Sequence, residues 1–168
     1  PGDAYFKQVA QLAEKVLDKK WPVKDSDLIR MQVRFCLVAT REKARQIIQA
    51  VRGGQNFEVI ALRESMEGRE NGNLVAPEPF LRVDNPPFFA ATMRANLRVG
   101  QLSREPIESG EYWLVLRLEQ YLPPETLTGK AREAAVARIK AYRMSRLIPA
   151  LRQRFRPERP IPYARVLE

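Results

Sequence analysis

The sequence predicts an α+β protein with a small, mainly antiparallel sheet of about four strands, surrounded by helices and extended by further helices at both ends. Two short apolar segments, residues 33–38 and 112–118, have the composition of strands. Between them, apolar residues recur at helical spacing, which predicts helices packed on a sheet. Longer amphipathic stretches over residues 3–20 and 128–155 predict the terminal helices.

The N-terminal helix is predicted from a single apolar stripe behind a possible N-cap at Asp3. The residues of this stripe are Phe6, Val9, Leu12, Ala13, Val16 and Leu17. We expect the helix to end before Trp21-Pro22, because proline disfavours helical backbone at the residue that precedes it. Asp25 or Ser26 can then cap a short helical turn that leads into the first strand.

The first strand, residues 33–38, is followed by two predicted helices. The first is an amphipathic run that closes at Gly53-Gly54, and the second is a short helix that ends at Ser65. The chain has one cysteine, Cys36, so it cannot form an intramolecular disulfide. Because Cys36 lies among apolar residues of the strand, we interpret it as a small buried hydrophobic residue.

Four features follow these helices. They are the loop 70–74, an aromatic, proline-flanked loop over residues 77–89, a Gly-Gln-Leu-Ser corner within residues 99–106, and the last strand, 112–118. The aromatic loop holds more large apolar side chains than a plain surface connection needs. Two interpretations stay open: its phenylalanines cover the core, or at least one of them floors a groove for an extended peptide.

The C-terminal region begins where Pro123-Pro124 closes the central domain. Residues 128–155 predict a long helix, kinked or split at Pro149, and a proline-rich tail follows it. The predicted domains are therefore an N-terminal helical segment (1–31), a central domain (32–122), and a basic helix with its tail (123–168). The terminal helices can form one lobe, within one chain or between two copies, or they can serve as a stabilising layer.

The order of these motifs from Val33 to Glu119, about half of the chain, resembles the parvulin-type peptidyl-prolyl isomerases, the rotamase domain of SurA-like and PrsA-like bacterial foldases. The family's first histidine falls on Phe35 and its second on Trp113. Its active-site cysteine or aspartate falls near Glu67. The glycine-rich turn of the family matches 71–75, which keeps one glycine and the leucine.

This resemblance implies a pocket for proline-containing peptides without the family's histidines. The chain contains no histidine at all, which also excludes Ser-His-Asp catalysis and histidine-bound zinc. We expect a proline pocket from Phe88, Phe89 and Leu81, a reshaped floor from Phe35 and Trp113, and Glu67 as the one polar group that faces the amide. No cofactor and no metal ion are expected. Binding of unfolded or proline-containing polypeptides, with weak or lost isomerase activity, is the expected function.

A formal charge of +9 and a pI near 10.0 draw the chain towards acidic partners. The basic residues concentrate in the last predicted helix, where a solvated face is the simplest interpretation. The alternative is an interaction module in which the rotamase fold is a scaffold and this helix docks on an anionic membrane surface or an acidic protein. Base-specific nucleic-acid binding is not expected, because no recognition motif is present.

The resemblance implies a location outside the cytoplasm, either periplasmic or anchored to a membrane. No apolar run approaches the roughly 20 residues of a membrane-spanning helix. Because the chain begins at Pro1-Gly2, we expect it to be a piece of a longer protein.

Overall fold

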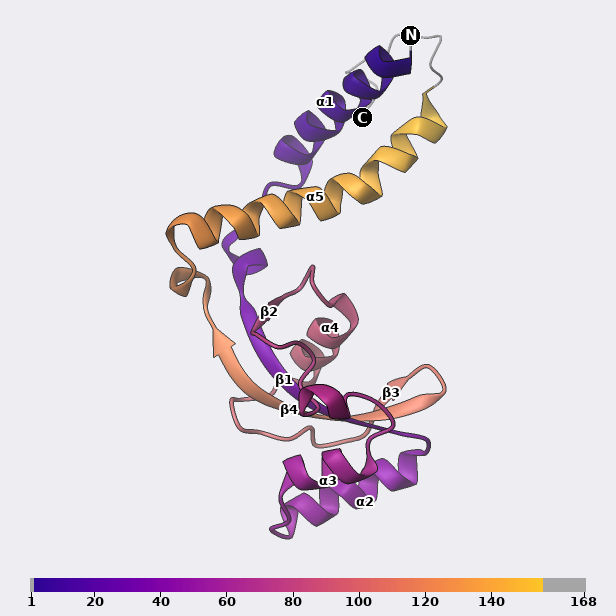
Figure 1. Cartoon of the computed structure of the whole chain (residues 1–168), viewed down its shortest axis with the longest axis vertical. Helices are drawn as coiled ribbons and strands as arrows, with labels where there is room; N and C mark the ends of the chain where they lie inside the picture. Colours follow the sequence, from indigo (N-terminus) through magenta and orange to yellow (C-terminus); the bar gives the residue numbers. More distant parts are fainter. Residues whose placement is uncertain (1, 156–168) are drawn as a thin grey trace. The chain divides into compact units, whose positions relative to one another are not determined.

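The computed structural model describes residues 2–155, and the chain divides into two compact units (Figure 1). Unit 1 combines the N-terminal residues up to 28 with the residues from 127 onward. Unit 2 comprises residues 29–126. Both terminal helices therefore belong to the same unit, as the sequence allowed.

Unit 1 is built from two helices, α1 (Gly2–Lys20) and α5 (Gly129–Arg154), with the short 3-10 helix η1 (Asp25–Leu28). The apolar side of α1 packs against the C-terminal half of α5 within the same chain, but Phe6, which was predicted on this side, is exposed. The buried residues of this interface are Tyr5, Val9, Leu12, Ala13, Val16 and Leu151. Among the described residues, none of the helices has the length and apolar character needed to cross a membrane.

Helix α5 runs through Pro149 as a single element, so the predicted split does not occur. A proline removes one backbone N–H from the helical hydrogen-bond ladder. Packing offsets this loss, because Leu151 of the following turn is buried against α1 and the Tyr5 hydroxyl donates a hydrogen bond of 2.8 Å to the Phe155 carbonyl.

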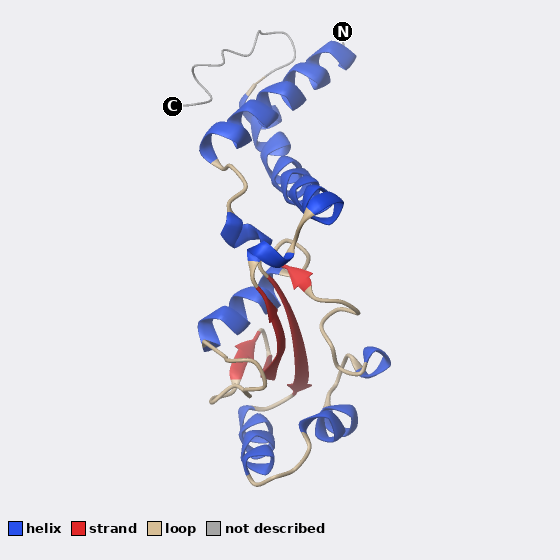
Figure 2. Ribbon diagram, turned by 90° about the vertical axis from the view of Figure 1, so that its left-hand side faces the viewer, coloured by secondary structure: helices blue, strands red, loops and turns tan. Residues whose placement is uncertain are grey.

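Unit 2 contains a four-stranded antiparallel sheet with the order β2-β1-β4-β3. Figure 2 shows its strands in red. The strands are β1 (Arg30–Val38), β2 (Phe80–Leu81), β3 (Ile107–Ser109) and β4 (Tyr112–Leu122). The 3-10 helix η3 (Pro124–Thr126) follows β4 and ends the unit. This architecture confirms the predicted α+β class and the sheet of about four strands.

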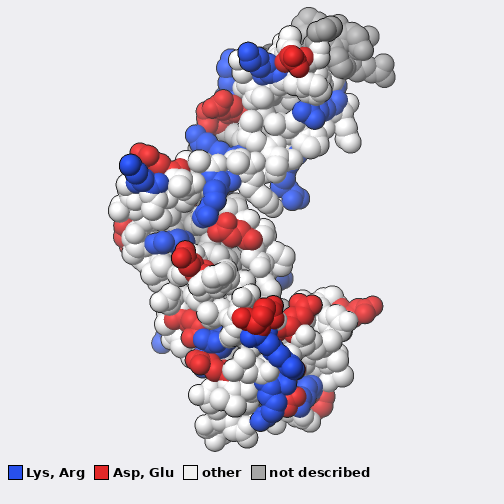
Figure 3. All heavy atoms as spheres, viewed as in Figure 1, with Lys and Arg blue, Asp and Glu red and all other residues white. Residues whose placement is uncertain are grey.

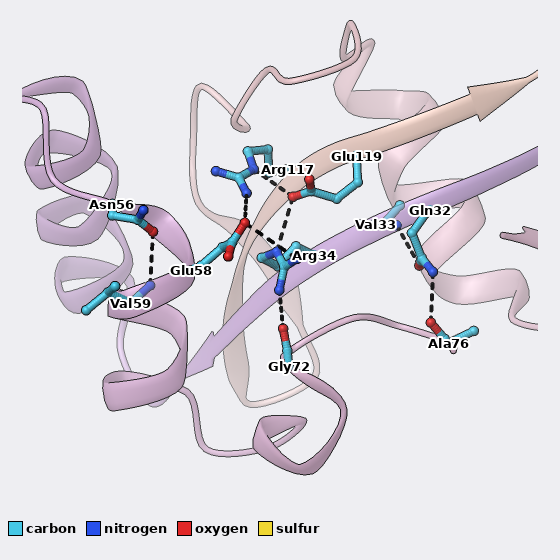
Figure 4. Close-up of polar contacts among 10 residues, drawn as sticks. All are labelled: Gln32, Val33, Arg34, Asn56, Glu58, Val59, Gly72, Ala76, Arg117 and Glu119. Carbon is cyan, nitrogen blue, oxygen red and sulfur yellow. Dashed lines mark hydrogen bonds and ion pairs between the residues drawn. The ribbon is translucent and has the colours of Figure 1, made fainter. Parts of the chain in front are cut away.

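The two central strands pair along most of their length, with Phe35 opposite Leu116. A bulge interrupts the register between Gln32 and Val33. The buried Gln32 side chain supports the bulge, because its Oε1 accepts from the Val33 N–H at 3.1 Å and its Nε2 donates to the Ala76 carbonyl at 2.9 Å (Figure 4). The Val33 N–H at the bulge thus finds a partner in the Gln32 side chain.

Helices cover both faces of the sheet. Helix α4 (Pro86–Ala95) packs on one face, and α2 (Arg41–Arg52) with α3 (Phe57–Glu64) packs on the other. Because side chains alternate along a strand, Phe35 of β1 faces α4, whereas Cys36 faces α2 and α3.

Polar side chains fix where these helices begin. Thr40, Asn56 and Asn85 each accept a hydrogen bond from the backbone N–H three residues later, at the starts of α2, α3 and α4. Helix α4 corrects the prediction of a loop over residues 77–89. Its Pro86-Pro87 pair occupies the first turn, where proline is tolerated because the missing N–H has no helical partner.

Candidate functional site

A cavity of about 390 Å³ opens on the α4 side of the sheet in unit 2. Its walls come from β1, from the segment between α3 and β2, and from the first turn of α4. The lining residues are Phe35, Met66, Glu67, Gly68, Glu70, Asn71, Leu74, Val75 and Phe88. Its apolar side chains are Phe35, Met66, Leu74, Val75 and Phe88, and the polar groups gather in residues 67–71.

Two aromatic rings form the floor of the cavity. The centroids of Phe35 and Phe88 are 5.0 Å apart, and the ring planes are tilted by 52°. Phe35 is 7% exposed and Phe88 is half-buried. Gly68 adopts a positive φ of +89° and brings its backbone against the Phe35 ring. A side chain at position 68 would occupy the space that the ring fills.

The part of the lining that contains Leu74 and Val75 is joined to β1 by backbone hydrogen bonds. The Phe35 N–H donates to the Asn73 carbonyl at 2.9 Å, and the Val75 N–H donates to the Val33 carbonyl at 3.0 Å. Residues 73–75 therefore extend the sheet beside β1. Asn73 is fully buried, with a φ of 62°, a left-handed conformation that asparagine tolerates better than most residues.

The backbone of Glu67 is held by two side chains. Its carbonyl accepts a hydrogen bond of 2.7 Å from the Ser65 hydroxyl and one of 3.1 Å from the Asn73 amide. The Ser65 Oγ in turn accepts from the Leu37 N–H at 3.0 Å. The Glu67 side chain itself is exposed. Its backbone position is thus fixed, while its carboxylate stands at the rim of the cavity.

A network of ion pairs contacts the segment between α3 and β2 at Gly72 (Figure 4). Arg34 donates to the Gly72 carbonyl and to Glu119, the latter at 3.3 Å. Arg117 donates to Glu119 at 2.7 Å and to Glu58 at 3.2 Å. The network joins β1, β4, α3 and the turn at Gly72, which follows the lining residue Asn71.

The charge at the cavity is acidic. Glu67 and Glu70 contribute carboxylates to the lining, and no lysine or arginine lines it. The neighbouring Arg69 points elsewhere, because its guanidinium donates to the carbonyls of Ser65 and Arg63, each at 3.0 Å. A cationic group on a bound ligand would therefore meet two carboxylates at this rim.

Three of the residues predicted for the site line this cavity: Phe35, Glu67 and Phe88. Leu81 and Phe89 do not line it. Each is 1% exposed and belongs to the core, Leu81 in β2 and Phe89 against the Phe80 ring. They support the fold around the site and have no surface for a ligand in this structure.

Trp113 faces the opposite side of the sheet and does not share a floor with Phe35. It packs with the α2 and α3 cluster, and the Arg41 guanidinium lies 5.8 Å from its ring centroid. A shift of one position along a strand reverses the face of a side chain. Leu114, Leu116 and Leu118 are the β4 residues that share the face of Phe35.

The sequence interpretation missed several lining residues, among them Met66, Leu74 and Val75. Met66 is 51% exposed immediately after the buried Ser65. A large apolar residue in a turn, between Ser65 and Glu67, is the sequence signal that could have pointed to it.

No family model matches this sequence, and no curated protein matches it. Solved structures do resemble the chain. The peptidylprolyl isomerase PrsA from Bacillus cereus is 21% identical, with a TM-score of 0.64, over 84% of this chain and 54% of that chain. PrsA from Bacillus anthracis is 20% identical, with a TM-score of 0.59, over 84% of this chain and 66% of that chain.

The foldase protein PrsA from Streptococcus pneumoniae is 14% identical, with a TM-score of 0.54, over 86% of this chain and 60% of that chain. The chain thus spans between about half and two thirds of the length of these three structures. The similarity agrees with the antiparallel sheet, its helices and the motif order of residues 33–119. The chain has the parvulin-type fold of the peptidyl-prolyl isomerases.

Proposed function

We propose that unit 2 is a foldase-type domain that binds extended, unfolded or proline-containing polypeptide segments in the cavity beside Phe35, with weak or lost isomerase activity. One observation carries the proposal. An open cavity of about 390 Å³ has the paired rings of Phe35 and Phe88 as its floor. Concave sites that combine apolar side chains with a few polar groups bind small ligands, and the two rings supply an apolar surface here.

The lining suits a proline ring and its neighbours in an extended chain. The pyrrolidine ring is apolar on both faces and can pack on Phe35 and Phe88, while Met66 and Leu74 contact adjacent side chains. Glu67, Glu70 and Asn71 lie at the polar end of the cavity and can accept hydrogen bonds from the peptide backbone.

The same lining argues for slow turnover. Rotation about the peptide bond has a barrier of about 18–20 kcal/mol, and a catalyst lowers it by binding the twisted amide more tightly than the planar one. Such binding needs donors directed at the reacting group. Asn71 supplies the only side-chain N–H or O–H among the residues that line this cavity, if both carboxylates are ionised. The chain has no histidine to serve instead.

We further propose that unit 1 acts as a chaperone lobe that binds unfolded segments. Its paired helices α1 and α5 stand outside the isomerase fold and leave Phe6, 48% exposed, on the surface. An exposed apolar side chain in a chain that also carries a peptide-binding domain suits capture of unfolded segments, while a purely stabilising layer stays the alternative. The location outside the cytoplasm implied by the family resemblance also stays a prediction.

The basic helix offers less support for docking on a membrane or an acidic protein. Arg132, Lys140 and Arg143 form ion pairs with Asp25, Asp18 and Asp27 of the same unit, at 3.0, 3.7 and 2.9 Å. Figure 3 shows acidic side chains beside the basic ones on the visible face of unit 1. Arg156 and Arg159, also part of the predicted basic run, lie outside the described residues.

Amide chemical-shift mapping with a short peptide of the type Ala-Leu-Pro-Phe tests the proposal. We expect the shifts to change around Phe35, Glu67 and Phe88. Replacement Phe88→Ala should abolish them, whereas Leu62→Ala, which truncates an exposed residue of α3, should leave them unchanged. Shift changes confined to other regions, or binding that survives Phe88→Ala, would contradict the site.

A protease-coupled isomerisation assay with the same peptide tests the second half of the proposal. We expect a rate close to that of the uncatalysed reaction, with peptide binding still visible by chemical shift. A rate enhancement that disappears in Phe88→Ala would leave the binding site in place and overturn the expectation of weak activity.

A further inference from the structure

A second region of unit 2, away from the cavity beside Phe35, is rich in arginine and hollowed. Three hollows of about 410, 500 and 220 Å³ are all lined by Arg104. We call this region the arginine surface. Its exposed arginines come from α2, from α4 and from the segment between α4 and β3: Arg45, Arg52, Arg94, Arg98 and Arg104.

The charge of this surface is not neutralised locally. Only Glu105 and Glu108 among the lining residues are acidic. Within residues 2–155, no ion pair joins any of the five guanidinium groups to a carboxylate. A guanidinium offers planar, paired donors that match a carboxylate in a bidentate fashion. The surface therefore selects for acidic groups.

Of the three hollows, the one of about 410 Å³, between α4 and the edge of the sheet, has the most apolar lining. Ala91 and Ala95 of α4 form one wall, and Pro106 and Ile107 contribute to the other. Strand β3 is the outer strand of the sheet and pairs with β4 on one side only. An outer strand offers backbone N–H and C=O groups to an added strand.

The backbone at this edge is held in place before any ligand arrives. The Ser103 N–H donates to the Leu116 carbonyl at 2.7 Å, and the Leu116 N–H donates to the Ser103 hydroxyl at 3.0 Å. The Arg52 guanidinium donates to the Arg104 carbonyl at 3.1 Å. A rigid edge lowers the ordering cost of binding.

We propose that the arginine surface binds an acidic polypeptide segment in extended conformation, lying along β3 with its carboxylates on Arg94 and Arg104. A peptide fits better than the phosphate backbone of a nucleic acid, because the 410 Å³ hollow has apolar walls for side chains and no aromatic residue lines any of the three hollows. Single-stranded nucleic acids are usually held by stacking on aromatic rings. The proposal does not depend on the function proposed for the cavity beside Phe35.

The test uses the full chain and a fluorescein-labelled peptide of alternating Glu and Val that contains no proline. Binding should weaken about tenfold or more in the double variant Arg94→Gln/Arg104→Gln. It should also weaken as salt rises from about 50 to about 300 mM. The control Lys7→Gln/Lys130→Gln removes the same charge from unit 1 and should change the affinity by less than about twofold.

Each other outcome overturns the proposal. Absence of binding, unchanged affinity in the Arg94/Arg104 variant, or equal loss in the lysine control would show no specific site. Tighter binding of a labelled oligothymidine of equal length, lost in the arginine variant, would assign the surface to phosphate. Amide shift changes should include Ile107–Ser109, and changes confined to the surroundings of Phe35 and Phe88 would place the peptide in the other cavity.

Discussion

The Cζ atom of Phe35 lies 2.5 Å from the position that a Cβ atom on Gly68 would occupy. No side chain fits at position 68 unless the ring moves, and the φ of +89° already favours glycine. We predict that Gly68→Ala lowers the free energy of unfolding by roughly 2–4 kcal/mol, from backbone strain and overpacking together. Urea denaturation measures this loss.

Gly54→Ala is the matched control. Gly54 also has a positive φ, +105°, but open space surrounds its missing side chain. The variant Gly54→Ala should therefore lower the free energy of unfolding only through backbone strain, by about 1–2 kcal/mol. Gly68→Ala should in addition weaken binding of the proline peptide, because the displaced Phe35 ring enters the cavity. Equal losses of unfolding free energy in Gly68→Ala and Gly54→Ala would show that the Phe35 ring can move aside without destabilising the fold.

The network around Arg34 gives a second prediction. Glu119 accepts from both Arg34 and Arg117, whose side chains are 15% and 20% exposed. Glu119→Gln should therefore destabilise the chain by about 1–3 kcal/mol, because two partly buried cations lose their shared carboxylate. Denaturant unfolding at neutral pH provides the measurement.

Glu58 belongs to the same network but is 50% exposed. Glu58→Gln should cost no more than about 1 kcal/mol, since water screens its ion pairs. If the two variants lose the same stability, burial does not set the strength of these pairs. A loss at Glu119 accompanied by shift changes near Gly72 would support the link between the network and the cavity wall.

The two long strands, β1 and β4, and most helices could be predicted because their patterns are local, whereas the short strands β2 and β3 were not located in the sequence. The apolar spacing of α2 and α3 and the glycines after α2 agree with the structure, and so does the stripe of α1 apart from Phe6, which is 48% exposed. Helix α4 was missed because two prolines near its start look like loop residues, although Asn85 caps it and its first turn needs no N–H from either proline.

The site was predicted only in part. Whether a residue lines the cavity depends on the sheet face to which its side chain points and on how deeply it is buried. Phe35, Glu67 and Phe88 line it, whereas Phe89 is buried one position beyond Phe88 on the same helix. Trp113 was assigned to the floor from its place in a triplet, but the strand register turns it to the other face. A motif match assigns a residue its position along the chain, whereas the strand register decides to which face of the sheet its side chain points.

Cys36 leads to a pH prediction. Burial raises the pKa of its thiol from 9.0 to about 11. Between about pH 9 and pH 11 the unfolded chain loses this proton while the folded chain keeps it, so the folded state becomes less stable as the pH rises. Below pH 9 both states hold the proton, and this group adds no pH dependence.

Unfolding in urea at several pH values, in the wild type and in Cys36→Ala, isolates this contribution. We expect the wild type to lose up to about 2–3 kcal/mol more than the variant between pH 9 and pH 11. Other groups titrate in both proteins and cancel in the comparison. Parallel pH profiles of the two proteins would show that the thiol is not buried as described.

The acidic rim of the cavity predicts which proline peptides bind best. Because Glu67 and Glu70 are the only charged lining residues, a peptide with Lys beside its proline should bind about threefold to tenfold more tightly than one with Glu there. The preference should shrink as salt rises, since both carboxylates are exposed. Fluorescence anisotropy with labelled peptides measures it.

The double variant Glu67→Gln/Glu70→Gln should remove this preference and leave binding of an uncharged proline peptide unchanged. Glu78→Gln/Glu125→Gln removes the same charge from exposed positions of unit 2 outside the cavity lining and should keep the preference. If the lysine peptide retains its advantage in the first variant, its cation binds elsewhere. If both variants lose the advantage equally, the net charge of the unit controls binding rather than the two carboxylates at the rim.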